Sequence, residues 1–154
     1  MRCGGLTWHL VSAAVAVLFL AGVVGCDKGP DIVTSIEFDG ATRTIKTPKV
    51  ICTKQPDGGL VILAQDTPRR SVRVQLTQHG RLVVQKAGLR HEGMAGFVAD
   101  SREVSATKVD DTFTISGRMP PNPGESQWHT FKIQTTCPGY IDALPPKGPG
   151  LGAP

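Results

Sequence analysis

The sequence predicts an all-β fold, a single small antiparallel β-sandwich or partly open β-barrel held by one disulfide. Short segments rich in β-branched residues alternate with Gly, Pro, Asn and Asp turn signals, and no segment keeps a helical period over several turns. Two cysteines, Cys52 and Cys137, each fall within a β-like run. Aromatic residues make up only 5% of the chain, so the core must be built mainly from Val, Ile and Leu and would gain from a covalent staple.

The start of the chain, residues 1–25, has the organisation of a lipoprotein signal peptide. A cationic start is followed by an apolar segment, Leu10 to Leu20, and then by Val23-Val24-Gly25-Cys26. These last four residues resemble the lipobox, whose thiol is diacylated before cleavage. A retained transmembrane helix is the alternative, because residues 4–25 carry no formal charge. The glycines that end this run and the lack of a Lys/Arg cluster behind it argue against that helix.

This interpretation divides the chain into a cleaved signal peptide, a short lipidated linker (26–31), a β-rich domain (32–144) and a Pro/Gly tail (145–154) expected to be disordered. The chain would be exported to the outer side of the cell membrane, in the cell envelope, with the membrane as its partner through acyl chains on Cys26. At ~3.3–3.6 Å per residue, the linker keeps the domain within about 20 Å of the bilayer. We expect a monomeric domain. A net charge of +4, with scattered basic residues and few aromatic groups, does not predict nucleic-acid binding.

Within the domain, residues 32, 34, 36 and 38 share one face of a first strand, and Asp39-Gly40 is a hairpin signal. Val72, Val74 and Leu76 alternate with polar residues and are expected to point inward. Residues 87–99 predict either a glycine-kinked strand or a loop, and residues 120–124 a loop. The predicted strands are 32–38, 43–46, 49–54, 60–64, 71–76, 81–86, 104–109, 112–118 and 128–137.

If Cys26 carries lipid, Cys52 and Cys137 are the two thiols left in the exported chain, and they most simply form one disulfide. On the chain-entropy model a loop of this length is worth about 4 to 5 kcal/mol. Two buried free thiols are the alternative. Neither cysteine has a second Cys or His at metal-ligand spacing, so we expect no metal site and no cofactor.

The sequence offers no catalytic constellation, and we expect no enzyme. His79, His91 and His129 are well separated and are expected to be exposed histidines of loops or strand ends. No G-x-S-x-G elbow or glycine-rich phosphate loop occurs. Asp110-Asp111 is an adjacent acid pair, but neighbours on a turn do not converge on a substrate, so it predicts a polar turn.

A run of basic residues without any acid extends from Thr67 to Arg90. On a short tether this surface could contact an anionic surface such as lipid headgroups, at about 1 kcal/mol per cation. The alternative is a solvated strand face whose charges prevent edge-to-edge pairing. The residues concerned are Arg69, Arg70, Arg73, Arg81, Lys86 and Arg90.

Several stretches together resemble the mycobacterial nineteen-kilodalton lipoprotein antigen family. They are the anchor at Cys26, SIEFDG followed by KVICT, the hairpin SATKVDDTFTISG, and HTFKIQTTC ending at Cys137. The resemblance implies a surface lipoprotein with a β-rich domain, a disulfide, no established enzymatic activity, and an acylated N-terminus that host Toll-like receptor 2 senses. The chain departs from the family in having CDKGPD where members often carry a Ser/Thr-rich glycosylated segment.

A carrier or binder of a hydrophobic envelope lipid is the alternative function. In that hypothesis a half-open β-structure encloses an acyl chain, with the glycine-rich residues 87–99 as one wall. The apolar residues of so short a chain are about what its own core consumes, and no amphipathic helix is predicted to cover a cavity. The sequence therefore favours the non-catalytic surface lipoprotein.

Overall fold

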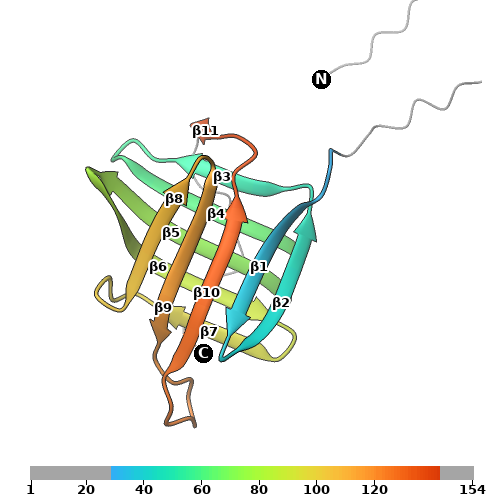
Figure 1. Cartoon of the computed structure of the whole chain (residues 1–154), viewed down its shortest axis with the longest axis vertical. Helices are drawn as coiled ribbons and strands as arrows, with labels where there is room; N and C mark the ends of the chain where they lie inside the picture. The colour runs from blue at the N-terminus through green and yellow to red at the C-terminus, as the bar shows by residue number, and fades with distance from the viewer. Residues whose placement is uncertain (1–28, 143–154) are drawn as a thin grey trace, which may run out of the picture.

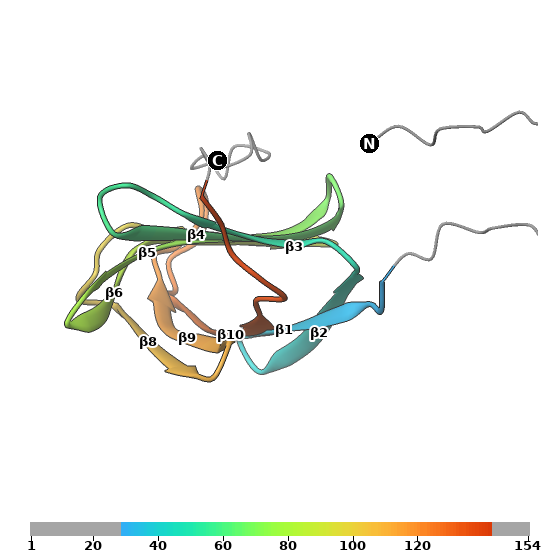
Figure 2. The same cartoon turned by 90° about the horizontal axis from the view of Figure 1, so that it is seen from above.

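Two β-sheets stacked face to face make up the protein in a computed structural model that describes residues 29–142 (Figures 1 and 2). The predicted all-β sandwich with one disulfide is confirmed, and the part of the chain described contains no helix. The strands are β1 (Ile32–Phe38), β2 (Ala41–Thr47), β3 (Val50–Lys54), β4 (Gly59–Thr67), β5 (Arg70–His79), β6 (Arg81–His91), β7 (Met94–Val98), β8 (Val104–Val109), β9 (Thr112–Met119), β10 (His129–Thr136) and β11 (Ile141–Asp142).

The strand order is β2-β1-β10-β9-β8 in a five-stranded sheet and β11-β3-β4-β5-β6-β7 in a six-stranded sheet. The chain passes from one sheet to the other after β2, after β7 and after β10. Neighbouring strands are antiparallel except β11, which pairs in parallel with β3. β11 could not be predicted from the sequence, because two residues are too few to show a period.

Turn chemistry accounts for the hairpins. Asp39 and Gly40 have φ of 48° and 80°, so the predicted Asp-Gly turn joins β1 to β2. Glu92 and Gly93 have φ of 40° and 89° and join β6 to β7 in the same way. Residues 87–99 are therefore mostly strand, namely the second half of β6 and all of β7.

The predicted ends of two strands, residue 64 for β4 and residue 76 for β5, were too early. β4 continues to Thr67 through an irregularity between Gln65 and Thr67. β5 likewise runs on to His79. A bulge in β6 opposite Gln75 and Leu76 keeps the apolar residues on both sides of it facing inward.

The core lies between the sheets. Val72, Val74 and Leu76 are fully buried, as predicted, and meet Ile36, Ile133 and their neighbours from the other sheet. All the buried residues of this cluster fall between Ile36 and Cys137. Because core, strands and disulfide are contained in residues 32–142, this part of the chain has what it needs to fold without residues 1–28.

Candidate functional site

The proposed lipid attachment residue, Cys26, lies outside the described residues, as do the signal peptide and the tail 145–154 predicted to be disordered. No helix that the described residues form is long and apolar enough to span a membrane. The described chain starts at residue 29, directly before β1. Candidate sites on the domain are therefore the disulfide, the basic residues and the histidines.

The disulfide joins the two sheets. Cys52 lies in β3 of the six-stranded sheet and Cys137 directly follows β10 of the five-stranded sheet, with 5.9 Å between their Cα atoms. Both side chains are buried, at 1% and 2% exposure. The predicted pairing is confirmed, and the bond is a structural staple within the core.

The predicted basic residues do not form one surface. Arg73, Lys86 and Arg90, which we call the basic trio, lie on the outer face of the six-stranded sheet. Arg81 shares that face at the start of β6. Arg69 is exposed in the turn between β4 and β5.

Arg70 is neutralised by its own neighbours. Its Nη2 lies 2.9 Å from Asp66 Oδ2, and its Nη1 lies 3.6 Å from Glu92 Oε1. Asp66 lies in β4 and Glu92 in the β6–β7 turn, so Arg70, the first residue of β5, has two acidic partners and does not present a free charge. These two ion pairs distinguish Arg70 from the other basic residues, and contact of this set with an anionic surface stays a prediction.

The histidines also differ from the prediction. His91 ends β6 but is buried at 4% exposure, because it shares the inward face of β6 with Leu89, and its Nε2 lies 3.3 Å from the carbonyl oxygen of Thr44. His129 at the start of β10 has only 12% of its side chain exposed. The side chain of His79 lies outside the described part of the structure.

His129 lies between two carboxylates. Its Nδ1 is 2.6 Å from Asp39 Oδ2, in the β1–β2 turn, and its Nε2 is 2.6 Å from Glu125 Oε2, in the loop before β10. The imidazole also stacks on Phe38, with ring centroids 4.8 Å apart. The backbone N–H of Thr130 donates to the other oxygen of Asp39 at 2.8 Å. We call Asp39, Glu125 and His129 the carboxylate–histidine bridge.

The bridge favours a protonated imidazole, because only the imidazolium can donate from both nitrogens. The hydrogen bond to Asp39 contributes most to raising the pKa of His129; burial opposes it, and the hydrogen bond to Glu125 adds to it. At Asp39 desolvation is the largest single effect and would raise the pKa, but hydrogen bonds from His129 and Thr130 together lower it. The pKa of Glu125 is lowered, first by His129 and then by the backbone N–H of Asn122.

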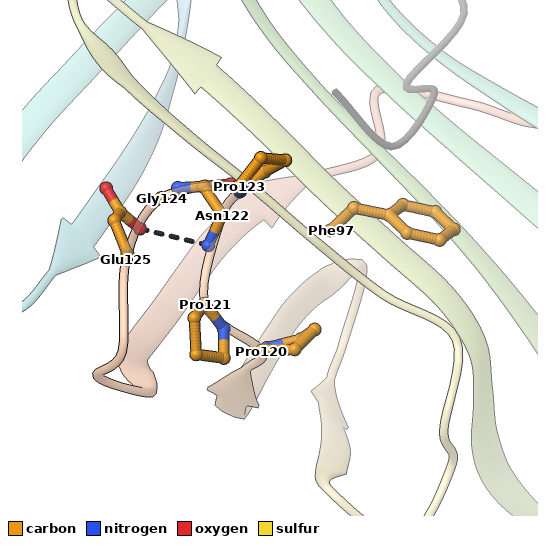
Figure 3. A pocket seen from close by; sticks show the side chains of 7 residues that line it. All are labelled: Phe97, Pro120, Pro121, Asn122, Pro123, Gly124 and Glu125. Atoms are coloured by element: carbon orange, nitrogen blue, oxygen red, sulfur yellow. Dashed lines mark hydrogen bonds between the residues drawn. The ribbon is translucent and has the colours of Figure 1, made fainter.

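The bridge fastens a proline-rich loop to the sandwich. The backbone N–H of Asn122 donates to Glu125 Oε2 at 3.0 Å (Figure 3), and its side-chain amide donates to the carbonyl of Ala95 in β7 at 3.0 Å. An open recess of about 500 Å³ lies here, lined by Phe97 and residues 120–125. The loop was predicted from its prolines, but its attachment was not.

The bridge is not a catalytic triad. Such a triad leaves one imidazole nitrogen for a nucleophilic hydroxyl or thiol, whereas a carboxylate occupies each nitrogen of His129. Asp110-Asp111 forms the β8–β9 turn, as predicted, and Asp111 accepts a hydrogen bond from the Tyr140 hydroxyl at 2.8 Å. Among the described side chains, no group of three or more His, Cys, Asp and Glu could hold a metal ion.

A comparison with family models identifies the family of this chain. The model of the Mycobacterium 19 kDa lipoprotein antigen matches residues 28–137, more than two thirds of the chain. The matched region starts just before β1, includes both cysteines of the disulfide and leaves Cys26 outside. No curated protein matches the chain. The chain therefore belongs to the Mycobacterium 19 kDa lipoprotein antigen family.

Proposed function

We propose that this protein is a non-catalytic, lipid-anchored lipoprotein of the cell envelope, exposed at the surface and recognised by host Toll-like receptor 2 through its acylated N-terminus. Residues 1–25 export the chain and are removed, and acyl chains on Cys26 hold the monomeric domain at the outer side of the membrane. The observation that carries the proposal is Val23-Val24-Gly25-Cys26 at the end of an apolar segment, in a chain of a lipoprotein antigen family.

The transfer free energy of the acyl chains is large enough for both membrane retention and receptor binding. Each CH₂ group moved from water into a bilayer contributes ~0.8 kcal/mol, and two or three chains exceed the marginal binding of a single myristoyl group. A receptor that buries the same chains draws on the same transfer free energy. A small polar β-surface has no comparable apolar area to offer.

Packing of the sandwich argues against the alternative function as a carrier of an envelope lipid. The core side chains are between 0% and 8% exposed and form one cluster that joins both sheets. An acyl chain between the sheets would have to displace them, at the cost of native packing. Native mass spectrometry of the unacylated domain tests this directly, since a co-purified lipid would favour the carrier.

Replacement of Cys26 tests the anchor. We expect Cys26→Ala to move the protein from the membrane to the soluble fraction, because the acyl chains are its strong hydrophobic attachment after cleavage. Cys3→Ala is a matched control that removes a thiol within the signal peptide without touching the lipobox. Because diacylation precedes cleavage, the parent chain provides the deciding measurement: it should be found in membranes without residues 1–25, and a parent chain that keeps residues 1–25 would show a transmembrane helix instead.

Separation of anchor and domain tests receptor recognition. An acylated peptide of residues 26–31 should keep most of the Toll-like receptor 2 signalling of the whole protein, and unacylated residues 27–154 should have little. Equal signalling by the unacylated domain would contradict the proposal and place the receptor contact on the β-surface.

A further inference from the structure

The basic trio surrounds one small residue on the outer face of the six-stranded sheet. Arg73 of β5 is opposite Gly88 of β6, and Lys86 and Arg90 lie two residues to either side of Gly88, with their side chains on the same face. Three cations thus occupy adjacent and diagonal positions of two paired strands. Like charges at such positions destabilise a sheet.

In the described part of the chain, no acidic residue lies beside the basic trio on this face. The outward positions that flank it on β4, β5 and β7 carry no charge; they are Leu63, Gln65, Ser71, Gln75, Ala95 and Phe97. Leu63 and Ser71 are buried, whereas Lys86 and Arg90 of the trio are exposed and Arg73 is partly exposed. Among the described residues, none of the trio takes part in an ion pair of 4.0 Å or less, whereas Arg70 has two acidic partners. The trio therefore presents unneutralised charge.

Protection of a sheet edge does not explain the two arginines. Arg73 lies in β5 between β4 and β6, and Arg90 lies between Ser71 of β5 and Ala95 of β7. Both strands are paired on each side at these positions, so no free edge needs shielding there. Lys86 lies just before the part of β6 that pairs with β7, and for that residue edge protection would suffice.

On the other outer face of the sandwich the cations lie apart from one another or beside an acid, as Arg118 does with Glu103. One row across all five of its strands, Thr107, Thr114, Gln134, Ser35 and Thr44, is uncharged. In the next row Lys132 is directly opposite Glu37. Among the described residues, a group of adjacent cations without an acid beside it is thus a feature of the six-stranded sheet, whereas Lys46 of β2 is a single cation.

We propose that the outer face of the six-stranded sheet rests on the anionic headgroup phosphates of the membrane that holds the protein. The nearness of that membrane rests on the proposed function. Arginine and lysine are the side chains that bind phosphate, and each contributes within a Debye length of an anionic leaflet. Half-buried Phe97 and half-exposed Ile141 share this face and add apolar contact at its margins.

The place where the chain enters the domain is compatible with this docking. Ile32 at the start of β1 pairs with Thr47 at the end of β2, directly before the chain crosses to β3 of the six-stranded sheet. In Figure 2 the start of β1 lies on the same side of the sandwich as the connection from β2 to β3, on the right of the view. A linker of residues 26–31 spans about 20 Å at most, so the domain stays next to the lipid surface.

Vesicle binding by unacylated residues 27–154 tests the proposal. The domain should sediment with phosphatidylcholine vesicles that contain phosphatidylglycerol, and not with pure phosphatidylcholine vesicles. Arg73→Gln/Lys86→Gln/Arg90→Gln should lower the partition coefficient by roughly 100-fold at low salt. The matched control, Arg43→Gln/Lys46→Gln/Lys132→Gln, removes the same charge from the five-stranded sheet and should retain most of the binding.

Two results would overturn the proposal: no binding of the parent domain to the anionic vesicles, or an equal loss in the control variant, which would show binding by net charge alone. If the triple variant does not fold, exposed Lys86→Gln alone decides, with about a fivefold loss expected and no loss contradicting the proposal. Because the domain in this experiment has no acyl chain, a negative result leaves the anchor untouched, and fractionation of Cys26→Ala tests the anchor separately.

Discussion

Loss of the Cys52–Cys137 disulfide should remove a large part of the stability of the domain. The bond closes a loop between residues that are 85 positions apart in the sequence. On the chain-entropy model, opening such a loop returns about 4 to 5 kcal/mol of conformational freedom to the unfolded chain. A domain of this size has a free energy of unfolding of about 5–15 kcal/mol in total, so the reduced form would be close to unfolding.

Two perturbations separate the covalent bond from the packing of its sulfur atoms. Reduction of the parent domain keeps both buried sulfurs, whereas Cys52→Ala/Cys137→Ala also leaves two small cavities in the core. The double variant should therefore be less stable than the reduced parent, by about 1 kcal/mol for each cavity. The single variant Cys137→Ser leaves a free thiol at Cys52 and should lose a few kcal/mol, within the usual range of ~2–5 kcal/mol for a native bridge.

Equilibrium urea unfolding of unacylated residues 27–154 measures these differences. With a urea dependence of ~1–3 kcal/mol per molar, a loss of about 4 to 5 kcal/mol should lower the midpoint by roughly 1–5 M on reduction. Thiol titration of the unfolded, unreduced domain provides the control and should find no reactive thiol. Two reactive thiols, or a loss below about 1 kcal/mol on reduction, would refute the assignment of the bond as the main staple between the sheets.

Two further predictions concern the carboxylate–histidine bridge and a glycine. The pKa of His129 is raised, so its contribution to the free energy of unfolding is complete below about pH 6.5 and is lost as the pH rises through the pKa of the folded state. The pKa values of Asp39 and Glu125 are lowered, so the contribution of these carboxylates is lost as the pH falls below about 4. Thermal melts should therefore show the largest gap between the parent and His129→Gln near pH 5–6, and a gap independent of pH would contradict the bridge. Gly117→Ala should cost about 1–3 kcal/mol, because its Cβ would lie 2.0 Å from a backbone oxygen of residue 103, whereas Gly139→Ala has open space and should be neutral in the same melts.

The strands that could be predicted are those in which alternation and turn chemistry agree. β1 ends at an Asp-Gly turn, and β5 alternates between buried valines and polar residues, so local sequence was sufficient. Residues 87–99 allowed either a glycine-kinked strand or a loop, because they contain Gly88, Gly93 and Gly96. In the structure the lack of a side chain at Gly96 makes room for Met119 and Phe38, because a Cβ there would lie 2.5 Å from Met119 Sδ and 3.1 Å from a ring carbon of Phe38.

The sites depended on partners distant in the sequence. His129 lies near Asp39, 90 residues away, and no local pattern indicates that a hairpin turn and a strand start will meet. Its spacing of four residues from Glu125 was the one available signal. The run of basic residues could be recognised in the sequence, but the strand register determines which of them share a face. The ion pair of Arg70 with Asp66 could not be predicted from the sequence.

The proposed docking face and the lipid anchor differ in energy, and this difference assigns them different roles. A contribution of about 1 kcal/mol per cation gives the basic trio a preference of roughly 100-fold for facing the anionic surface. The free energy of this preference is far smaller than the membrane-binding free energy of the acyl chains. The face therefore orients a domain that the anchor already retains, and a 100-fold preference corresponds to about 99% of molecules in one orientation. In that orientation the five-stranded sheet, with its row of hydroxyl and amide side chains, is turned away from the membrane. At physiological salt the Debye length is ~8 Å, so orientation should weaken at higher salt while membrane retention does not.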